Sequence, residues 1–366
     1  MKTIVLNIFK IVNWVLALVL ILTYVSVYIS PEFFWPMAFL GLLFPFLLIV
    51  NMALAIYWVS RRNWFFLVSL VVLLLGVQPI SKVYQMDYFS GSGEQQLKPD
   101  ESLTLLSYNV KIFDLLGKNQ FGEDQKALLA FIRQQDPDVV CFQEFYINAH
   151  KQFTLDTLKR YLPGLRYHHI FWVSQDRHFK YGIATLSKYP IVKKGRIDFG
   201  KSLNAAIYSD ILMDKERIRI YNNHLQSIRF NRNNYRFISN QRAFDDLTRL
   251  KEIRDIMRRL KEAFIKRSQQ AEKISSSINR SSYPVLVCGD FNDTPVSYTY
   301  HALSSGLNDA FVEAGSGVGV TYQGKFPSYR IDYIFYDKHF RIYDFGIMQK
   351  PFSDHYPIKA SLGIPK

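Results

Sequence analysis

The sequence predicts an α+β sandwich of packed β-sheets that is preceded by three transmembrane helices. Two observations support this prediction. The first eighty residues contain three long apolar runs without a charged residue, whereas the rest of the 366-residue chain consists of short apolar segments separated by polar turns. In that second part the strand patterns outnumber the helical patterns and do not alternate with them one by one, as they do in a regular βαβ sheet.

The three apolar runs cover residues 11–29, 36–59 and 64–80, and they contain 19, 24 and 17 residues. Because a helix needs about 20 residues to cross the hydrocarbon core, the third run is the shortest candidate. A cleaved signal peptide is the alternative interpretation of the first run. It is disfavoured because the run is long, no small-residue cleavage site follows, and two more apolar runs come after it. We therefore predict a transmembrane region over residues 1–89 that holds the chain in a lipid bilayer.

The charges around these runs predict an orientation. Two lysines precede the first run, Glu32 is the one charge between the first and second runs, and Arg61 and Arg62 follow the second. An excess of Lys and Arg in short loops marks the cytoplasmic side. The prediction is an integral membrane protein with a cytoplasmic N-terminus. After three crossings, everything beyond residue 82 lies on the extracytoplasmic side; a third run that is re-entrant or interfacial instead would place it on the cytoplasmic side.

A polar segment rich in Gly and Ser, residues 90–102, predicts a linker to a second domain at residues 103–366. Residues 91–366 carry a net charge of +11, so this domain has the composition of a soluble, basic protein, and it is long enough to bury a core. Helical periodicity is found at 125–135 and mainly at 234–274. The strand-like segments lie at 103–110, 137–145, 181–191, 203–213, 217–225 and 330–337.

Residues 229–280 form the most basic segment of the chain, with 14 Lys or Arg against six acidic residues. Arg254, Arg258 and Lys261 are three or four residues apart, so they share a face of the predicted helix. One interpretation is a solvated helix face. The other is a positively charged surface that binds phosphates, either the headgroups of anionic lipids or nucleic acid.

Polar residues follow several of the predicted strands, and singly each has a plain structural explanation. Asn109 is typical of a turn, His224 of a structural histidine, and Asp290 with Asn292 of an Asx-turn. Glu144 is less ordinary, because a carboxylate that closes an apolar run must be exposed, paired or bound to metal. Together these residues supply oxygen ligands of the kind that Mg²⁺ prefers, with a histidine for acid/base chemistry.

The sequence contains no HExxH motif, Cys/His cluster or Walker loop, which disfavours zinc-dependent proteases, structural zinc sites and P-loop enzymes. Six segments resemble, in their order, motifs of the endonuclease/exonuclease/phosphatase superfamily: "LSYNV", "DVVCFQEF", "NNHLQS", "CGDFND", "RIDYIF" and "SDHYPI". The resemblance implies a four-layered α/β/β/α sandwich of the deoxyribonuclease I type, with its site where the two sheets open at one end. It also implies a metal-dependent phosphoric ester hydrolase. It does not cover residues 1–90.

The resemblance also implies roles for individual residues. Asn109, Glu144 and Asp354 would hold the metal, Mg²⁺ with Mn²⁺ as a substitute, and Glu144 would be the central ligand. Asp290 would orient or deprotonate the attacking water, and Asn292 would donate a hydrogen bond to the scissile phosphate.

Two histidines complete the predicted site. His355, oriented by Asp332, would contact a phosphate oxygen and take part in acid/base chemistry. His224 occupies the position at which the nuclease and sphingomyelinase branches have a histidine that protonates the leaving oxygen. An inactive homologue is disfavoured, because every motif position retains a chemically competent residue.

These expectations leave three functions open. The leading hypothesis is a membrane-anchored, Mg²⁺-dependent phosphodiesterase that hydrolyses a phospholipid or sphingolipid headgroup ester. The second is a membrane-tethered endonuclease or exonuclease acting on DNA or RNA. The third is a non-catalytic membrane scaffold that uses the fold to bind phosphorylated partners.

Overall fold

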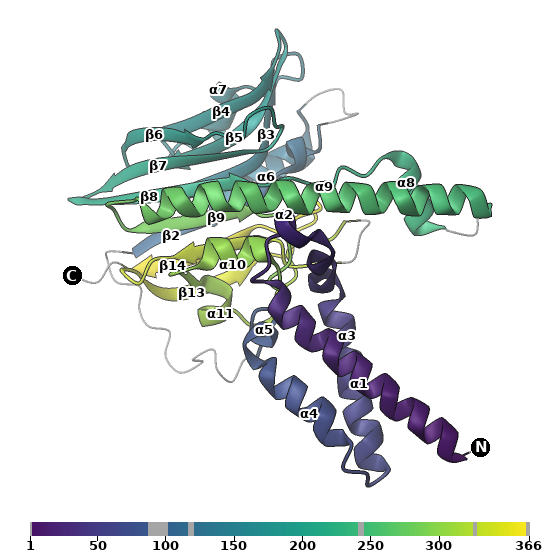
Figure 1. Cartoon of the computed structure of the whole chain (residues 1–366). Helices are drawn as coiled ribbons and strands as arrows, with labels where there is room; N and C mark the ends of the chain where they lie inside the picture. Colours follow the sequence, from purple (N-terminus) through teal and green to yellow (C-terminus); the bar gives the residue numbers. More distant parts are fainter. Residues whose placement is uncertain (1, 87–101, 116–120, 241–244, 325–327, 364–366) are drawn as a thin grey trace.

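The computed structural model describes residues 2–86, 102–115, 121–240, 245–324 and 328–363. Three apolar helices near the N-terminus, labelled α1, α3 and α4, pack side by side. They form the N-terminal bundle, which projects from the rest of the molecule (Figure 1). The predicted linker lies outside the described residues except for its last residue. The N-terminal helices are α1 (Lys2–Ser26), α2 (Pro31–Phe34), η1 (Trp35–Met37), α3 (Ala38–Ser60), α4 (Phe66–Leu75) and α5 (Val77–Ser81).

Two of the three predicted spans are long enough to cross a membrane, judged by length and composition. They cover Ile4–Ser26 and Pro31–Ser60, with 23 and 30 residues, and only 17% and 22% of their most apolar windows are buried. A helix in the core of a soluble protein is mostly buried, whereas most of the surface of these two helices is apolar and exposed. The predicted third span over 64–80 is wrong. Gly76 ends α4 after 10 residues, and Pro79 lacks the backbone N–H that would continue it, so α4 extends only about 15 Å, half of the hydrocarbon thickness.

Polar side chains connect the three helices of the bundle at its centre. Asn13 of α1 is fully buried, and its Oδ1 accepts hydrogen bonds from Trp58 Nε1 of α3 at 3.2 Å and Ser69 Oγ of α4 at 3.0 Å. Lipid offers no partners for such groups, so helices in a membrane satisfy them on one another. This network fixes the three helices relative to one another.

The sheet domain, residues 102–363, contains two six-stranded sheets. The first sheet has the order β13-β14-β2-β3-β5-β4 and the second the order β10-β12-β9-β8-β7-β6. A short pair, β1 (Tyr84–Gln85) and β11 (Gly317–Val318), joins the end of the bundle to this domain. The strands of the first sheet are β2 (Ser102–Asn109), β3 (Val139–Asn148), β4 (Tyr167–Gln175), β5 (Phe179–Ser187), β13 (Arg341–Ile347) and β14 (Ile358–Gly363). Those of the second are β6 (Ile191–Ile197), β7 (Ala205–Met213), β8 (Glu216–His224), β9 (Val285–Asp290), β10 (Asn308–Asp309) and β12 (Asp332–Tyr336).

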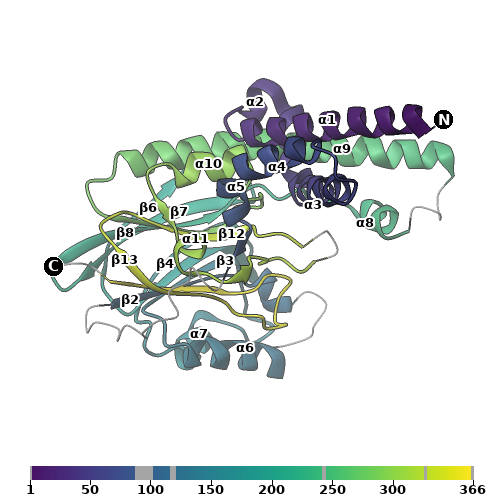
Figure 2. The same ribbon diagram turned by 90° about the horizontal axis from the view of Figure 1, so that it is seen from below.

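Helices lie against the outer face of each sheet (Figure 2). The inner faces pack together through a shared apolar core that contains Leu105 and Val139 of the first sheet and Ile220 and Leu286 of the second. Two further apolar cores lie on the outer sides of the sheets. In one the first sheet packs against α6 and α7, and in the other the second sheet packs against α9 and α10. The predicted α+β class is therefore confirmed as two sheets with accompanying helices. The helices and the 3₁₀ turn of this domain are η2 (Lys111–Asp114), α6 (Glu123–Gln134), α7 (Leu155–Tyr161), α8 (Arg232–Ser239), α9 (Asp246–Asn279), α10 (Tyr298–Ser304) and α11 (Ala310–Ala314).

Parallel pairing brings the ends of β2, β8 and β9 to one edge of the two sheets. In the first sheet β2 pairs parallel with β3, and in the second β8 pairs parallel with β9. Asn109 at the end of β2 lies beside Gln143 in the middle of β3, and His224 lies opposite Asp290 in register. The packing of the sheets then brings both edges together.

The bundle contacts the sheet domain next to this edge. The Thr294 hydroxyl donates to the Gly41 carbonyl at 3.4 Å, and the Tyr329 hydroxyl donates to the Leu42 carbonyl at 3.0 Å. A Cβ atom on Gly41 would lie 2.1 Å from the Val296 carbonyl oxygen, so this close approach requires glycine. The first turn of α3 is thus fitted closely against the loop that follows β9.

A buried ion pair beside β12 gives a prediction about stability. Arg330 is 4% exposed, and its guanidinium donates two hydrogen bonds to the Asp309 carboxylate, at 3.0 and 2.7 Å. We expect Arg330→Ala to lower the free energy of unfolding by about 3–5 kcal/mol, because it leaves a buried carboxylate without its partner. The measurement is the denaturation midpoint of the full chain in detergent micelles.

The matched control is Arg258→Ala on α9, which removes a half-exposed arginine with two acidic partners. Exposed ion pairs contribute little to stability, so the control should denature close to the wild type. Equal losses in the two variants would contradict the prediction.

Candidate active site

The first element of the site is a hydrogen-bonded group that joins the two sheets. Asn109, at the end of β2, donates from Nδ2 to Asp290 Oδ2 at 2.9 Å, and Asp290 ends β9 in the other sheet. Asn292 donates to the same carboxylate from its backbone N–H at 2.8 Å and from Nδ2 at 3.1 Å. Burial raises the pKa of Asp290 to about 6, although the ion pair with His355 and the Asn109 hydrogen bond oppose this rise.

Glu144 reaches the site from a β-bulge. The register between β3 and β5 shifts between Phe142 and Phe145, and Glu144 within this bulge has a φ of 50°. The sequence placed Glu144 at the end of a strand, whereas β3 continues to Asn148, so the bulge turns the carboxylate towards the site. The side chain is 27% exposed. Burial raises its pKa, and the neighbouring Asp354 adds to this effect against the positive charge of His355.

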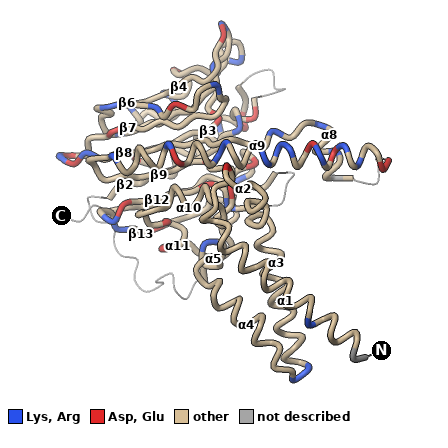
Figure 3. Tube along the Cα trace, viewed as in Figure 1, with Lys and Arg blue, Asp and Glu red and all other residues tan. Residues whose placement is uncertain are grey.

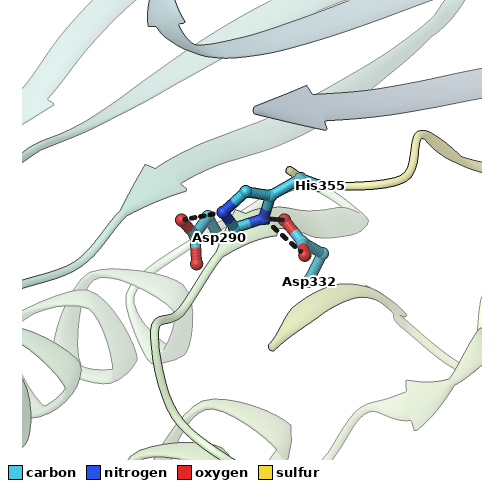
Figure 4. Close-up of side chains that lie close together, drawn as sticks. All are labelled: Asp290, Asp332 and His355. Carbon is cyan, nitrogen blue, oxygen red and sulfur yellow. Dashed lines mark hydrogen bonds and ion pairs between the residues drawn. The ribbon is translucent and has the colours of Figure 1, made fainter. Parts of the chain in front are cut away.

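His355 lies between two carboxylates from neighbouring strands (Figure 4). Its Nδ1 is 3.0 Å from Asp332 Oδ2, and its Nε2 is 3.7 Å from Asp290 Oδ2. Burial disfavours the charged imidazolium, but the ion pairs with Asp332 and Asp290 outweigh it and raise the pKa of His355 to about 10. The group therefore carries a positive charge at neutral pH, and Asp332 fixes the orientation of its ring.

His224 has the opposite character. It is buried, its Nε2 lies 3.8 Å from Glu144 Oε1 and 3.9 Å from Asp290 Oδ2, and this nitrogen has no hydrogen-bond partner among the described residues. Burial lowers the pKa of His224 to about 4, against the attraction of Asp290. A buried nitrogen without a partner costs about 1–3 kcal/mol, so the arrangement favours an additional oxygen atom at this point.

A cavity of about 260 Å³ opens over these groups. All eight predicted residues come together around it: five line the cavity, and Asn109, His224 and Asp332 lie behind them in contact with at least one. The polar part of the lining consists mainly of Lys111, Glu144, Arg229, Arg267, Asp290, Asn292, Asp293, Tyr322, Asp354 and His355. The apolar part consists of Leu42, Ile228, Phe230, Phe264 and Ile331.

Sequence reasoning missed several of these residues. Lys111 pairs with Asp354 at 2.9 Å, and Arg267 of α9 is buried against Asp293 at 3.2 Å. Asp293 belongs to the "GDFND" segment, so the motif itself contained a signal for it. Arg267 is one of many basic residues on a long helix and Leu42 lies in an apolar run, so nothing in the sequence distinguishes either residue.

The donor atoms of the site fit a divalent metal ion. Glu144 and Asp354 provide carboxylate oxygens, Asn109 an amide oxygen, and these are the hard ligands that Mg²⁺ and Mn²⁺ take. The Lys111 ammonium already lies against Asp354, which identifies this position as one that attracts a cation. Asp290, Asp332 and His355 are also close enough to hold a metal, within 4.8 Å of one another. In that group the charged His355 already compensates the carboxylates, whereas Glu144 and Asp354 have only Lys111 beside them.

Comparison with known proteins agrees with this geometry. A family model described as the endonuclease/exonuclease/phosphatase family matches residues 106–355, more than half of the chain. The chain belongs to that family. Its members are phosphoric ester hydrolases that typically depend on a divalent metal ion, so the predicted enzyme class is confirmed. A second model, described as a domain of unknown function, matches residues 6–83. No curated protein sequence gives a significant match.

Solved structures of this family have the same fold. A family protein from Bacteroides vulgatus is 17% identical with a TM-score of 0.52, and covers 72% of this chain and 99% of its own. One from Leptotrichia buccalis is 18% identical with a TM-score of 0.50, and covers 72% and 100%. D. rerio TDP2, solved with a single-strand DNA product, is 18% identical with a TM-score of 0.50, and covers 72% and 100%. At these identities the likeness concerns the fold alone.

The crowding of carboxylates predicts that the site destabilises the metal-free protein. The raised pKa of Glu144 means that its charged form is less favourable in the folded than in the unfolded chain, so its ionisation lowers stability above its ordinary pKa. We expect Glu144→Gln to raise the thermal midpoint of the metal-free chain at pH 7–8, and to abolish the further rise that Mg²⁺ or Mn²⁺ gives to the wild type.

The measurement is thermal unfolding with chelator and with added metal. Glu262→Gln, which removes an exposed carboxylate on α9, is the control and should leave the metal response unchanged. A metal response in Glu144→Gln equal to that of the wild type would contradict the assignment of Glu144.

Proposed function

We propose that this protein is a membrane-anchored, divalent-metal-dependent phosphodiesterase that hydrolyses the headgroup ester of a membrane lipid. The observation that supports this proposal is the composition of the cavity. Its wall combines the carboxylates and His355 with apolar residues, among them Leu42 near the start of α3, a helix of the N-terminal bundle. A phosphate ester with an apolar tail matches both kinds of residue, and a bilayer around the bundle would supply it.

Each residue has a role in such a hydrolysis. Asp290, held by Asn109 and Asn292, accepts the proton of the attacking water as the water oxygen forms its bond to phosphorus. The charged His355, fixed by Asp332, faces the developing charge on a phosphate oxygen. His224 faces the leaving oxygen with Nε2, and as the ester bond breaks it passes to this oxygen the proton that Asp290, 3.9 Å away, took from the water. Asn292 contacts the scissile phosphate.

The metal ion belongs with Glu144, Asp354 and Asn109 in this proposal. When bound, it would neutralise negative charge on the phosphate oxygens, as divalent ions do in phosphoryl transfer. Mg²⁺ is the proposed ion and Mn²⁺ a substitute, because both take oxygen ligands. Lys111 then pairs with Asp354 from the other side and limits the negative charge of the site.

We further propose that the sheet domain lies on the extracytoplasmic side. Arg61 and Arg62 lie at the far end of α3, whereas the sheet domain contacts the near end through Gly41 and Leu42 (Figure 3). Positive loop residues face the cytoplasm, so the opposite ends of the helices lie outside it. In this proposal α4 and α5 together, with the break at Gly76 between them, return the chain from Arg62 to that outer end. The bonds of Asn13 with α3 and α4 support a retained anchor over a cleaved signal sequence, because removing α1 would leave those partners unsatisfied.

The proposed chemistry predicts that substitution of His224 or of Glu144 lowers the activity. The full chain reconstituted in phospholipid vesicles should release a phosphorylated headgroup with Mg²⁺ or Mn²⁺ and lose this activity with chelator. His224→Asn should lower kcat by about 10²–10⁴-fold, the usual contribution of a general acid or base. Glu144→Gln should lose metal-dependent turnover.

His339→Asn, at an exposed histidine away from the cavity, is the matched control and should retain full activity. Cleavage of plasmid without hydrolysis of any lipid would replace the lipid proposal with the nuclease hypothesis. Absence of hydrolysis of every ester would favour a phosphate-binding scaffold.

The position of Leu42 in the cavity wall predicts that a substitution there lowers activity on bilayer lipid but not on a soluble substrate. Leu42→Gln replaces an apolar wall residue with a polar side chain of similar length and does not touch the catalytic groups. We expect about a tenfold loss of activity on bilayer lipid, the effect of losing one buried aliphatic contact, and no loss on the soluble diester bis(p-nitrophenyl) phosphate. Leu43→Gln, on the exposed face of α3, is the control. Equal effects on both substrates would contradict a role for Leu42 in lipid binding.

A further inference from the structure

The N-terminal half of α9 has an apolar surface that no described residue covers. Leu247, Leu250, Ile253 and Met257 are between 38% and 81% exposed. Their spacing of three, three and four residues places them on one face of the helix as a continuous apolar stripe. Figure 1 shows that this half of α9, together with α8, extends beyond the two sheets. A row of this length on a surface helix marks an interaction site.

The stripe continues a contact that the same helix face already makes with the bundle. Phe264 lies on that face, seven residues after Met257. Its ring packs against the ring of Phe39 of α3, and the two ring centroids are 5.2 Å apart. Lys261 lies between Met257 and Phe264 on this face, and its Nζ is 5.2 Å from the centroid of the Trp35 ring. Residues seven apart share a helix face, so the stripe is directed to the side from which the apolar helices approach.

Charges beside the stripe identify the occupant as an anionic surface. Arg254 lies on one edge of the stripe and Lys251 next to that edge, and among the described residues neither forms an ion pair, whereas Arg258 is paired with Asp255 and Glu262. The whole segment 229–280 has a net charge of +8. A helix with an apolar face and basic flanks binds in the interface between headgroups and acyl chains, and each basic residue near an anionic leaflet contributes about 1 kcal/mol.

We propose that residues 247–257 of α9 lie in the headgroup region of the bilayer that holds α1 and α3, with the apolar stripe towards the acyl chains and Lys251 and Arg254 on anionic headgroups. The protein then has two kinds of membrane contact, the spanning bundle and an interfacial helix. The charged residues predict that the second contact strengthens with the fraction of anionic lipid.

This contact also positions the active site relative to the membrane. Phe264 and Arg267 of the same helix line the cavity, opposite Leu42 of α3. Because α9 is one continuous helix from Asp246 to Asn279, fixing its first half on the bilayer fixes the height of the cavity above the surface. This second step depends on the proposed lipid substrate, whereas the binding of the helix to the bilayer does not.

Fluorescence quenching in lipid nanodiscs with one copy of the full chain tests the contact. Cys141 and Cys288 are buried, so an environment-sensitive fluorophore attached to Leu250→Cys reports this position alone. We expect doxyl groups on the acyl chains to quench the label at 250, more strongly with phosphatidylserine than with phosphatidylcholine alone. Glu262→Cys, which lies more than a right angle away around the helix, is the matched control and should remain unquenched.

Two outcomes would overturn the proposal. A label at 250 that is quenched no more than the label at 262 excludes contact with the acyl chains. A label at 250 that is shielded from water but not quenched by lipid, or is shielded only when two copies share a particle, assigns the stripe to a protein partner or to a second copy.

Activity measurements separate this inference from the proposed function. Leu250→Asp with Met257→Asp should lower turnover of anionic bilayer lipid about tenfold, the effect of losing roughly one buried aliphatic side chain from the interface, and leave the soluble diester unaffected. Unchanged lipid turnover would contradict the positioning role. If the wild type hydrolyses no ester at all, the proposed function fails, while the quenching result still decides whether the helix binds the bilayer.

Discussion

The hydrogen bond from Asn109 to Asp290 is the contact on which the site depends, because it joins the ends of strands from two different sheets. A second inter-sheet bond, from Gln143 Nε2 to Asn222 Oδ1 at 2.7 Å, lies deeper in the same interface. An apolar interface tolerates small shifts between sheets, but a buried polar pair does not, since an unpaired partner costs about 1–3 kcal/mol. These bonds therefore set the relative position of the sheets, and with it the distances between catalytic groups.

Strained backbone is concentrated around the same groups. Glu144 and Asn292 have φ values of 50° and 53°, and the four residues from Lys111 to Asp114 lie between 44° and 58°. For side chains other than glycine this region costs roughly 1–2 kcal/mol per residue. Such strain persists only where the surrounding core determines the conformation, and here apolar residues such as Phe113 and Phe145 are fully packed on both sides of it. The stability of the two-sheet core thus maintains a locally unfavourable backbone at Glu144, at Asn292 and in the turn after Asn109.

The sequence was sufficient for the parts of the site that follow from local chemistry. Asp290 after a buried strand and the His224 and Asn109 strand ends were predictable, because parallel strands bring their ends to a common edge. The bulge at Glu144 was not, since a bulge depends on the register with a neighbouring strand. The third span was overestimated because hydropathy alone does not register the break at Gly76. Arg267 and Leu42 could not be assigned to the site from the sequence, because only tertiary packing brings them to the cavity.

The junction between bundle and sheet domain gives the N-terminal helices a structural role at the site. Gly41 approaches Val296 so closely that no side chain fits, and Thr294, which bonds to Gly41, is two residues from Asn292. The loop that presents Asn292 is therefore held by β9 on one side and by α3 on the other. A tilt of α3 would be transmitted to this loop through direct contacts, since close-packed interfaces transmit displacement. The same packing brings Leu42 into the cavity wall, so the geometry of the site depends on a helix of the N-terminal bundle.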